Sequence, residues 1–363
     1  MNENNMKDFE LDELSDELYA DAPGLDPELE WKEEAVTESP IEEASVERIG
    51  DFMVRNGNEA VEYVGTSTVV VIPEGITKID SFFLEGKTVT EVHIPSTVTE
   101  ISGAAFFEAP DLKNIFVDED NPAYKSIDGC LYDKSGKTFI RCPSDRELVE
   151  IAEGTEKVVS CAFFQCSVKE IKLPSTLKIL EEGAFTSCSI WERMDELVLP
   201  YGIEFGKEVF MYSTLPPHIT LQGITKLPER AFANATFGMV RLPDTLTEIG
   251  DYALSGNDAC RVYIPKSVTK MGKGVFNYYY SDGTEGYFED DLEPDVYPCP
   301  DGFVLGVDNE ECYAAQYARE NNIPYEVVTD IEAFLNVERP EIYHRYEMIM
   351  ESRNQQTNDD SPF

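Results

Sequence analysis

Residues 91–106 read EVHIPSTVTEISGAAF, and this stretch decides the fold because the chain repeats it. It returns at residues 170–185 as EIKLPSTLKILEEGAF and at residues 261–276 as RVYIPKSVTKMGKGVF. Weaker copies begin at Val69, Leu148, Glu196, His218 and Met239. The position after each strand-like segment, the anchor, is held by Pro73, Pro95, Ala152, Pro174, Pro200, Gln222, Pro243 and Pro265. Most neighbouring anchors are 21 or 22 residues apart, with 26 residues between Pro174 and Pro200, and a fixed period of this length is typical of a solenoid.

Each copy opens with the alternation of a half-buried strand. In the first copy, Val92 and Ile94 point to one side of the strand, while Glu91 and His93 point to the other. Proline then ends the strand because it has no N–H to donate. Apolar residues at the third and sixth positions after the anchor predict a turn over the core, and a small residue followed by phenylalanine closes the copy. One copy cannot bury these groups alone, so we expect the copies to stack into one continuous solenoid with a single parallel sheet.

The pattern xVxIPxxVTxIxxxAF resembles the BspA-type leucine-rich repeat, and the resemblance extends from about Asp51 to Val328. Four further segments are similar to that group's opening segment, hairpin insert, AFxxC segment and closing helix and strand: residues 51–65, 121–132, 162–166 and 313–325. The resemblance implies an α/β solenoid, a right-handed superhelix with a parallel β-sheet on one face and a short helical C-terminal cap. For function it implies a binding surface and no particular target, because function resides in sites and not in folds.

The composition divides the chain into four regions. Residues 1–46 are rich in Asp and Glu, and we interpret them as an acidic disordered tail. Residues 47–328 form the predicted solenoid, with a hairpin insert at about 121–143 and an acidic loop at 281–295. Residues 329–353 are expected to form C-terminal helices, and residues 354–363 a second disordered tail.

Two of these regions allow a second interpretation. The apolar residues between Phe9 and Tyr19 are spaced for a short docking helix, as an alternative to a solvated tail. The helices after Val328 begin at a capping box of Thr329 and Glu332 and break at Pro340. Their apolar face would either cap the open end of the solenoid or meet a partner.

The chain is strongly acidic, with 71 acidic against 29 basic residues and a net charge of −42. Such a field repels phosphate backbones and anionic lipid, which argues against nucleic acid as a partner. Residues 1–10 lack the basic and apolar regions of a secretory signal, and no apolar run is long enough to span a membrane. We therefore expect a cytoplasmic protein, with the cell surface as the alternative if a leader has been removed.

The eight cysteines do not form the framework of a small disulfide-rich domain, because the chain is long. Cys166 and Cys188 occupy equivalent positions in adjacent copies and should lie close together. They form either a disulfide or metal pair or part of a ladder of small buried residues, with Ala109 and Ala235 at the same position. In the hairpin insert, the predicted register pairs Cys130 with Phe139, so that Cys130 and Cys142 are not opposed.

No catalytic, cofactor or metal motif is present in the sequence. His93 and His218 belong to distant copies, and there is no nucleophile elbow, phosphate-binding loop, zincin motif or zinc-binding Cys/His spacing. The acidic segment 281–295 lacks the EF-hand pattern, so an exposed loop is the simpler interpretation than a calcium site. We expect no enzymatic activity, no cofactor and no metal.

The outward positions of the strands are free of the core and therefore free to bind. Two positions before the anchors lie Val71, His93, Glu150, Lys172, Val198, Thr220, Arg241 and Tyr263, and four positions before them lie Val69, Glu91, Leu148, Glu170, Glu196, His218, Met239 and Arg261. The last members gather two arginines and a tyrosine, which are enriched in interface hot spots. We therefore predict partner contacts at Met239, Arg241, Arg261, Tyr263, Lys172 and His93. Pairing of Arg241 and Arg261 with surface acids is the alternative.

These observations favour a non-enzymatic scaffold that binds a protein partner on the exposed strand face. The alternative is a surface-exposed adhesin or glycan-binding protein. Aromatic residues stacked against sugars would favour the alternative, but both tryptophans, Trp31 and Trp191, lie outside the strand columns.

Overall fold

The structure, a computed structural model, describes residues 45–190, 193–257, 261–279, 296–297, 299 and 302–336. Most of the predicted acidic tail, the whole loop 281–295, the helical segment around Pro340 and the C-terminal tail lie outside the described residues.

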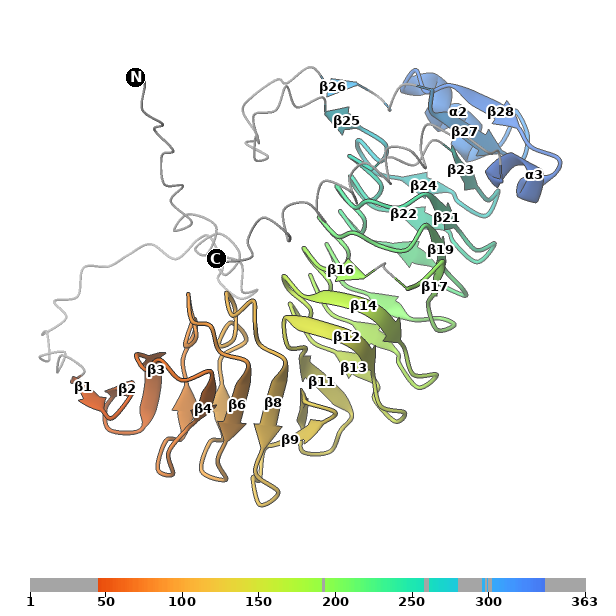
Figure 1. Cartoon of the computed structure of the whole chain (residues 1–363). Coiled ribbons are helices and arrows are strands. Elements are labelled where there is room, and N and C mark those ends of the chain that lie inside the picture. The colour runs from red at the N-terminus through yellow and green to blue at the C-terminus, as the bar shows by residue number, and fades with distance from the viewer. Residues whose placement is uncertain are drawn as a thin grey trace, which may run out of the picture. The chain divides into compact units, whose positions relative to one another are not determined.

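Stacked coils build a solenoid from Phe52 to Val327, with a series of strands along its front (Figure 1). The front strands are β4 (Val69–Val71), β6 (Glu91–Ile94), β8 (Asn114–Val117), β12 (Asp145–Glu150), β14 (Ser167–Lys172), β16 (Ser189–Ile190), β17 (Glu196–Val198), β19 (His218–Thr220), β21 (Met239–Arg241), β23 (Arg261–Ile264), β27 (Val304–Val307) and β28 (Tyr325–Val327). Neighbours pair in parallel, as in the register of Val71, His93 and Phe116 on β4, β6 and β8. The predicted strands around Val92, Ile171, Val198, Arg241 and Val262 are confirmed.

The front strands form four three-stranded sheets and not the single sheet that we expected. These sheets have the orders β4-β6-β8, β12-β14-β16, β17-β19-β21 and β23-β27-β28. The first break lies where the hairpin insert enters between β8 and β12. The second lies between β16 and β17, within the coil that has the longer anchor spacing of 26 residues.

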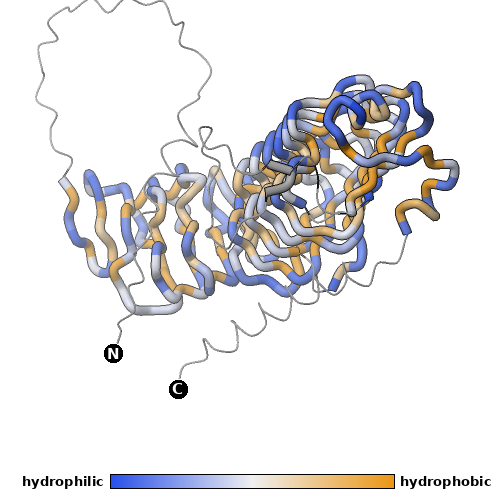
Figure 2. Tube along the Cα trace, turned by 90° about the horizontal axis from the view of Figure 1, so that it is seen from above, coloured by the Kyte–Doolittle hydropathy of each residue, from blue (hydrophilic) through white to orange (hydrophobic). Residues whose placement is uncertain are grey.

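A second series of parallel strands runs behind the first, where the sequence indicated only a turn. These two-residue strands are β5 (Lys78–Ile79), β7 (Glu100–Ile101), β13 (Lys157–Val158), β15 (Ile179–Leu180), β18 (Glu204–Phe205), β20 (Lys226–Leu227), β22 (Glu248–Ile249) and β24 (Lys270–Met271). Their second residues point inward, and Ile79, Leu180 and Ile249 are fully buried. Hydrophobic residues thus alternate with hydrophilic ones around each coil, as Figure 2 shows.

One phenylalanine of the hairpin insert and the closing phenylalanines of the next four coils form a stack through the core. Phe139, Phe163, Phe185, Phe210 and Phe232 follow one another with ring centroids 4.4–5.2 Å apart and nearly parallel planes. Each ring therefore covers the ring of the neighbouring coil, which is the burial that a single repeat cannot achieve.

The hairpin insert consists of β9 (Tyr124–Ile127), β10 (Cys130–Asp133) and β11 (Thr138–Arg141), and it divides the core in two. Leu131 on β10 belongs to the apolar cluster of the N-terminal coils. Its neighbour Tyr132 belongs to the cluster of the C-terminal coils. Because side chains alternate along a strand, β10 presents one face to each half of the solenoid.

The predicted register of this hairpin is wrong. A bulge at Leu131 and Tyr132 leaves Ile140 unpaired, so that Tyr132 opposes Phe139 and Leu131 opposes Arg141. Cys130 consequently lies toward Cys142 and not opposite Phe139. Tertiary packing decides this bulge, because β10 must serve two clusters at once.

The cysteines beside this hairpin are buried free thiols. Cys166 and Cys188 lie in adjacent coils, as predicted, and Ala109 and Ala235 are buried like them. No disulfide joins the seven cysteines in the part of the chain that the structure describes. Burial raises the pKa of the Cys142 and Cys188 thiols.

Both ends of the solenoid are covered. At the N-terminal end, β1 (Val46–Ile49), β2 (Phe52–Arg55) and β3 (Glu59–Tyr63) form an antiparallel unit, and β3 continues in parallel with β5. At the C-terminal end, helix α2 (Tyr313–Glu320) buries Ala314, Ala315, Tyr317 and Ala318. The predicted closing helix and strand are thus present as α2 and β28.

A short pair and a short helix complete the described chain. Strands β25 (Tyr278–Tyr279) and β26 (Val296–Tyr297) pair antiparallel on either side of the acidic loop. Helix α3 (Ile331–Leu335) follows β28, and its N-cap is Asp330, whose carboxylate accepts the Ala333 N–H at 3.0 Å. The predicted cap at Thr329 is therefore wrong by one residue.

Candidate functional site: the outward face of the front strands

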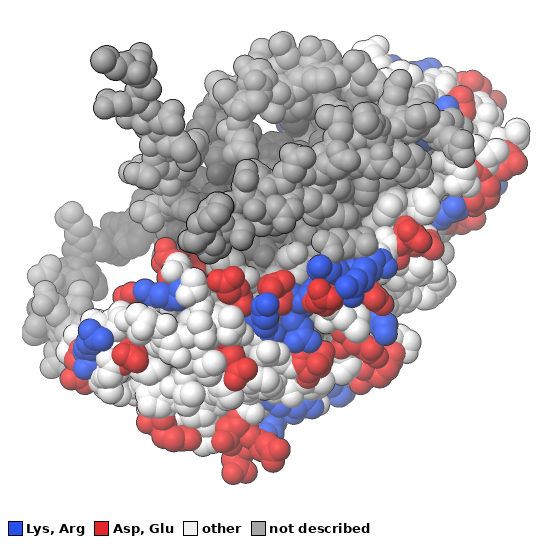
Figure 3. Space-filling view, viewed as in Figure 1, with Lys and Arg blue, Asp and Glu red and all other residues white. Residues whose placement is uncertain are grey.

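The outward side chains of the front strands, here called the strand face, differ in character from end to end. Over the N-terminal coils, Figure 3 shows mainly uncharged surface. Val69, Val71 and Phe116 are exposed by 41%, 64% and 37%. The His93 ring lies between Val71 and Phe116 in register, 5.2 Å from the Phe116 ring centre, and contacts the Glu91 carboxylate. We call Val69, Val71, His93 and Phe116 the apolar patch.

Sequence reasoning missed Phe116 because its coil lacks the anchor proline. Asp118 stands at the anchor position, two residues after Phe116, and the copy was not recognised as a repeat. The signal that could have found it is the strand-like alternation of residues 114–117, which lies 23 residues after that of β6.

Charged side chains cover the middle of the strand face, where Figure 3 shows blue and red residues side by side. Lys172, one of the predicted partner residues, is exposed and pairs with Glu150 at 3.2 Å. Glu147 accepts from Lys169 at 3.4 Å and from Arg193 at 2.8 Å, and these two cations hold its pKa below the ordinary value. Exposed pairs of this kind contribute little stability. The region is therefore a polar surface of paired charges, in contrast to the apolar patch.

At the C-terminal coils, two of the predicted contact residues are buried and not exposed. Met239 and Tyr263 are each only 7% exposed. They form an apolar cluster with Phe334 and Leu335 of α3, against which Val304 and Val328 pack. The outward position was correctly predicted, but the chain itself returns to cover it. Periodicity within a repeat cannot show this because α3 lies outside the repeats.

The two arginines of this region pair with acids of the same chain. Arg241 binds the Glu332 carboxylate, which raises the pKa of the arginine and lowers that of Glu332. Arg261 donates to Glu326 at 3.1 Å and stacks over the Phe334 ring at 4.8 Å from its centre. Of the two interpretations, the structure therefore shows the pairing with acids. Contact with a partner at these residues stays a prediction.

The hydroxyl of Tyr263 is also held within the protein. It lies 3.4 Å from the Asp308 carboxylate. Burial and the neighbouring carboxylate raise the pKa of Tyr263 to about 12.

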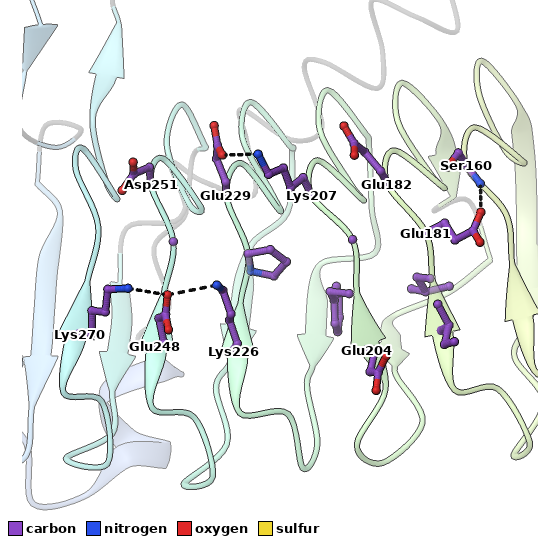
Figure 4. A pocket seen from close by; sticks show the side chains of 16 residues that line it. Ser160, Glu181, Glu182, Glu204, Lys207, Lys226, Glu229, Glu248, Asp251 and Lys270 are labelled. Carbon is purple, nitrogen blue, oxygen red and sulfur yellow. Dashed lines mark hydrogen bonds and ion pairs between the residues drawn. The ribbon is translucent and has the colours of Figure 1, made fainter. Parts of the chain in front are cut away.

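A shallow groove of about 830 Å³ lies on the other ladder of strands, between β15 and β24. Figure 4 shows its charged lining. Glu248 accepts from Lys270 at 3.0 Å and from Lys226 at 3.2 Å, and Lys207 pairs with Glu229 at 2.9 Å. The lysines hold the pKa of Glu248 below its ordinary value. The groove is therefore lined by a ladder of ion pairs between coils.

The described residues contain no group of three or more His, Cys, Asp or Glu side chains that could hold a metal ion. His93 and His218 lie in different sheets, and His344 is outside the described residues. Within the part of the chain that is described, no helix is long and apolar enough to cross a membrane.

The repeat pattern corresponds to a known family over most of the solenoid. The sequence matches the family model of the BspA type leucine rich repeat region in six copies, over residues 55–145, 135–195 and 203–284. The chain belongs to the BspA-type leucine-rich repeat family. No curated protein matches the chain.

Solved leucine-rich repeat structures are similar to this BspA-type chain at low identity. The Eubacterium ventriosum protein shares 19% identity over 60% of this chain and 64% of its own, with a TM-score of 0.44. The Bacteroides ovatus protein shares 21% identity over 74% of this chain and 64% of its own, with a TM-score of 0.39. A leucine rich cell surface protein of Faecalibacterium prausnitzii shares 16% identity over 84% of this chain and 100% of its own, with a TM-score of 0.35. The match thus spans less than two thirds of the first two structures.

Proposed function

We propose that this BspA-type repeat protein is a non-enzymatic scaffold that binds a protein partner on its strand face. The observation that carries the proposal is the docking of α3 on the C-terminal end of this face, where Phe334 and Leu335 pack on Met239 and Tyr263. The face thus accepts a short amphipathic segment in its own chain. At the other end, the apolar patch offers exposed side chains of the same kind, which typically mark a binding site when they are contiguous.

Within this proposal the predicted residues have different roles. His93 lies in the apolar patch, and Lys172 lies in the charged region next along the strand face. Both would contact the partner directly. Met239, Arg241, Arg261 and Tyr263 would do so only after α3 has left. The net charge of −42 disfavours nucleic acid as that partner.

The experiment compares two baits in native lysate, the full chain and its Val71→Asp/Phe116→Ser variant. We expect the variant to lose a protein that the wild type captures, and the purified protein to bind the variant about tenfold more weakly, since an apolar interface core does not tolerate a buried charge. Tyr212→Ser is the control, because Tyr212 is 46% exposed but lies in a loop away from the strand face. Equal affinity for both baits, with circular dichroism unchanged, would contradict the proposal.

The compartment and the glycan alternative are tested separately. We keep the cytoplasmic placement as our prediction and the cell surface as its alternative. Fractionation of native cells with an antibody against the solenoid distinguishes them. Saturable binding to a glycan array that Phe116→Ser abolishes would favour the adhesin alternative over a protein partner.

A further inference from the structure

Gly306 makes room for the ring of Phe334. Gly306 lies in register between Tyr263 on β23 and Glu326 on β28, at an outward position where other strands carry a side chain. A β-carbon on Gly306 would lie 2.6 Å from Cε1 and 2.9 Å from Cζ of Phe334. The backbone of Gly306 does not have a positive φ, so the conformation does not require glycine. The absence of a side chain instead leaves space for the ring, and the backbone of Gly306 forms the floor of a socket.

The remaining sides of the socket are also built from the strand face. Tyr263 and Val304 belong to the strands on which the ring rests, and Val328 packs from the segment after β28. Arg261 lies over the ring as a cationic lid, 4.8 Å from its centre. The ring is enclosed on all these sides, because Phe334 is only 5% exposed. We call Gly306, Arg261, Tyr263, Val304 and Val328 the aromatic socket.

Basic groups at the rim select an acidic helix. Arg241 binds Glu332 of α3, which stands two residues before Phe334. Arg261 lies above the ring, although it is itself paired with Glu326 of β28. On a chain with 71 acidic and 29 basic residues, Arg241 beside an apolar socket provides a local site for a carboxylate, because its partner Glu332 belongs to α3 itself.

Helix α3 depends on tertiary contacts to keep its place. It has five residues, far fewer than a helix needs to be stable alone. Only Phe334 and Leu335 are buried, while Ile331 remains 38% exposed. Its docking therefore depends on the socket and on the Glu332–Arg241 pair, and a segment with the same groups can compete for them.

We propose that the aromatic socket is a binding site for a partner protein's acidic amphipathic helix, with an aromatic residue two positions after a carboxylate, and that α3 occupies it in the free protein. The partner helix displaces α3. Because it binds only when α3 is undocked, its apparent affinity is the intrinsic affinity of the socket multiplied by the fraction of molecules in which α3 is undocked. This inference rests on the proposed use of the strand face and specifies the chemistry of the partner.

The test uses the full chain and a labelled synthetic peptide of residues 329–336, TDIEAFLN, followed by fluorescence anisotropy. Phe334→Ala empties the socket, and we expect it to bind the peptide about tenfold more tightly than the wild type does. The Phe334→Ala/Gly306→Ala double variant places a β-carbon in the space that the peptide's phenylalanine ring needs. We expect this variant to lose the tenfold gain in peptide affinity. Adding Gly103→Ala is the matched control, because Gly103 also has no positive φ and a β-carbon on it would have no other atom within 4 Å.

Thermal unfolding verifies that each variant is folded, and Phe334→Leu replaces Phe334→Ala if the latter is not. Equal peptide binding by the wild type and the emptied chain, or binding that Gly306→Ala leaves unchanged, would overturn the proposal. Such a failure is separate from failure of the proposed function, since capture through Val71 and Phe116 does not involve the socket.

Discussion

The rings of Phe163 and Phe185 stack with their centroids 4.4 Å apart and their planes tilted by 16°. They occupy the closing position of two successive coils, and Phe185 stacks in turn on Phe210 at 5.2 Å. A single side chain thus contributes to two interfaces between coils. The coupling of neighbouring repeats in this solenoid depends on such shared side chains.

Phe185→Ala should therefore destabilise the fold strongly. Phe185 is 1% exposed, and truncation of a buried phenylalanine costs about 3–5 kcal/mol through lost burial and the cavity left behind. Urea unfolding followed by circular dichroism measures the change. Phe82→Ala serves as the control, since Phe82 is 36% exposed, and should cost about 1 kcal/mol or less. A midpoint for Phe185→Ala close to that of the wild type would contradict the prediction.

Asn121 attaches the hairpin insert to the coil before it. Its buried amide donates to the carbonyls of Pro95 and Val98 at 2.8 Å, and its oxygen accepts the N–H groups of Ala123 and Tyr124. Asn121→Ala leaves these buried groups without their partner and should lower the free energy of unfolding by about 2–3 kcal/mol.

The matched control for this prediction is Asn58→Ala. Asn58 donates an exposed hydrogen bond to Thr77 at 3.0 Å. Its substitution should lower the free energy of unfolding by less than about 1 kcal/mol. Chemical unfolding of both variants provides the comparison. Similar costs for the two would show that the insert is held by other contacts.

The buried thiols should be unreactive in the folded protein. Cys142 and Cys188 are at most 1% exposed, and burial raises the pKa of both, so little thiolate is present or accessible at neutral pH. Alkylation with iodoacetamide, followed by peptide mass spectrometry, should label Cys312 well before either of them. Labelling of all three at one rate in the folded state would refute this expectation.

Docking of α3 should weaken in acid. The hydrogen bond from Arg241 lowers the pKa of Glu332 below its ordinary value of 4.5, so Glu332 binds protons more weakly when α3 is docked. Its contribution is complete above the undocked pKa and is lost as the pH falls through the lowered docked value. Fluorine NMR of 4-fluorophenylalanine at position 334 measures the docked fraction.

Glu332→Gln is the control for the acid effect. In this variant α3 should dock less at neutral pH, and its docking should lose the part of the pH dependence that Glu332 causes. Identical pH curves for the wild type and this variant would exclude Glu332 as the titrating group.

The candidate site was only partly predictable. The outward positions of His93, Lys172, Arg241 and Arg261 follow from strand alternation, which requires only the local sequence. Phe116 was missed because its coil lacks the proline that marked the others. The bulge that leaves Ile140 unpaired could not be read from the hairpin, because it depends on the two cores that β10 serves.

The sequence by itself determined the stacked coils, their strands and their buried closing phenylalanines, because every copy repeats the same local pattern and stacking is the one way to bury it. Only the tertiary structure decided which outward side chains stay exposed. Met239 and Tyr263 have the same place in their strands as Val69 and Val71, yet the first pair is buried and the second is exposed. The difference comes from Phe334, far along the chain, whose ring finds space above Gly306. Such a contact is set by the path of the chain in space, which local periodicity does not contain.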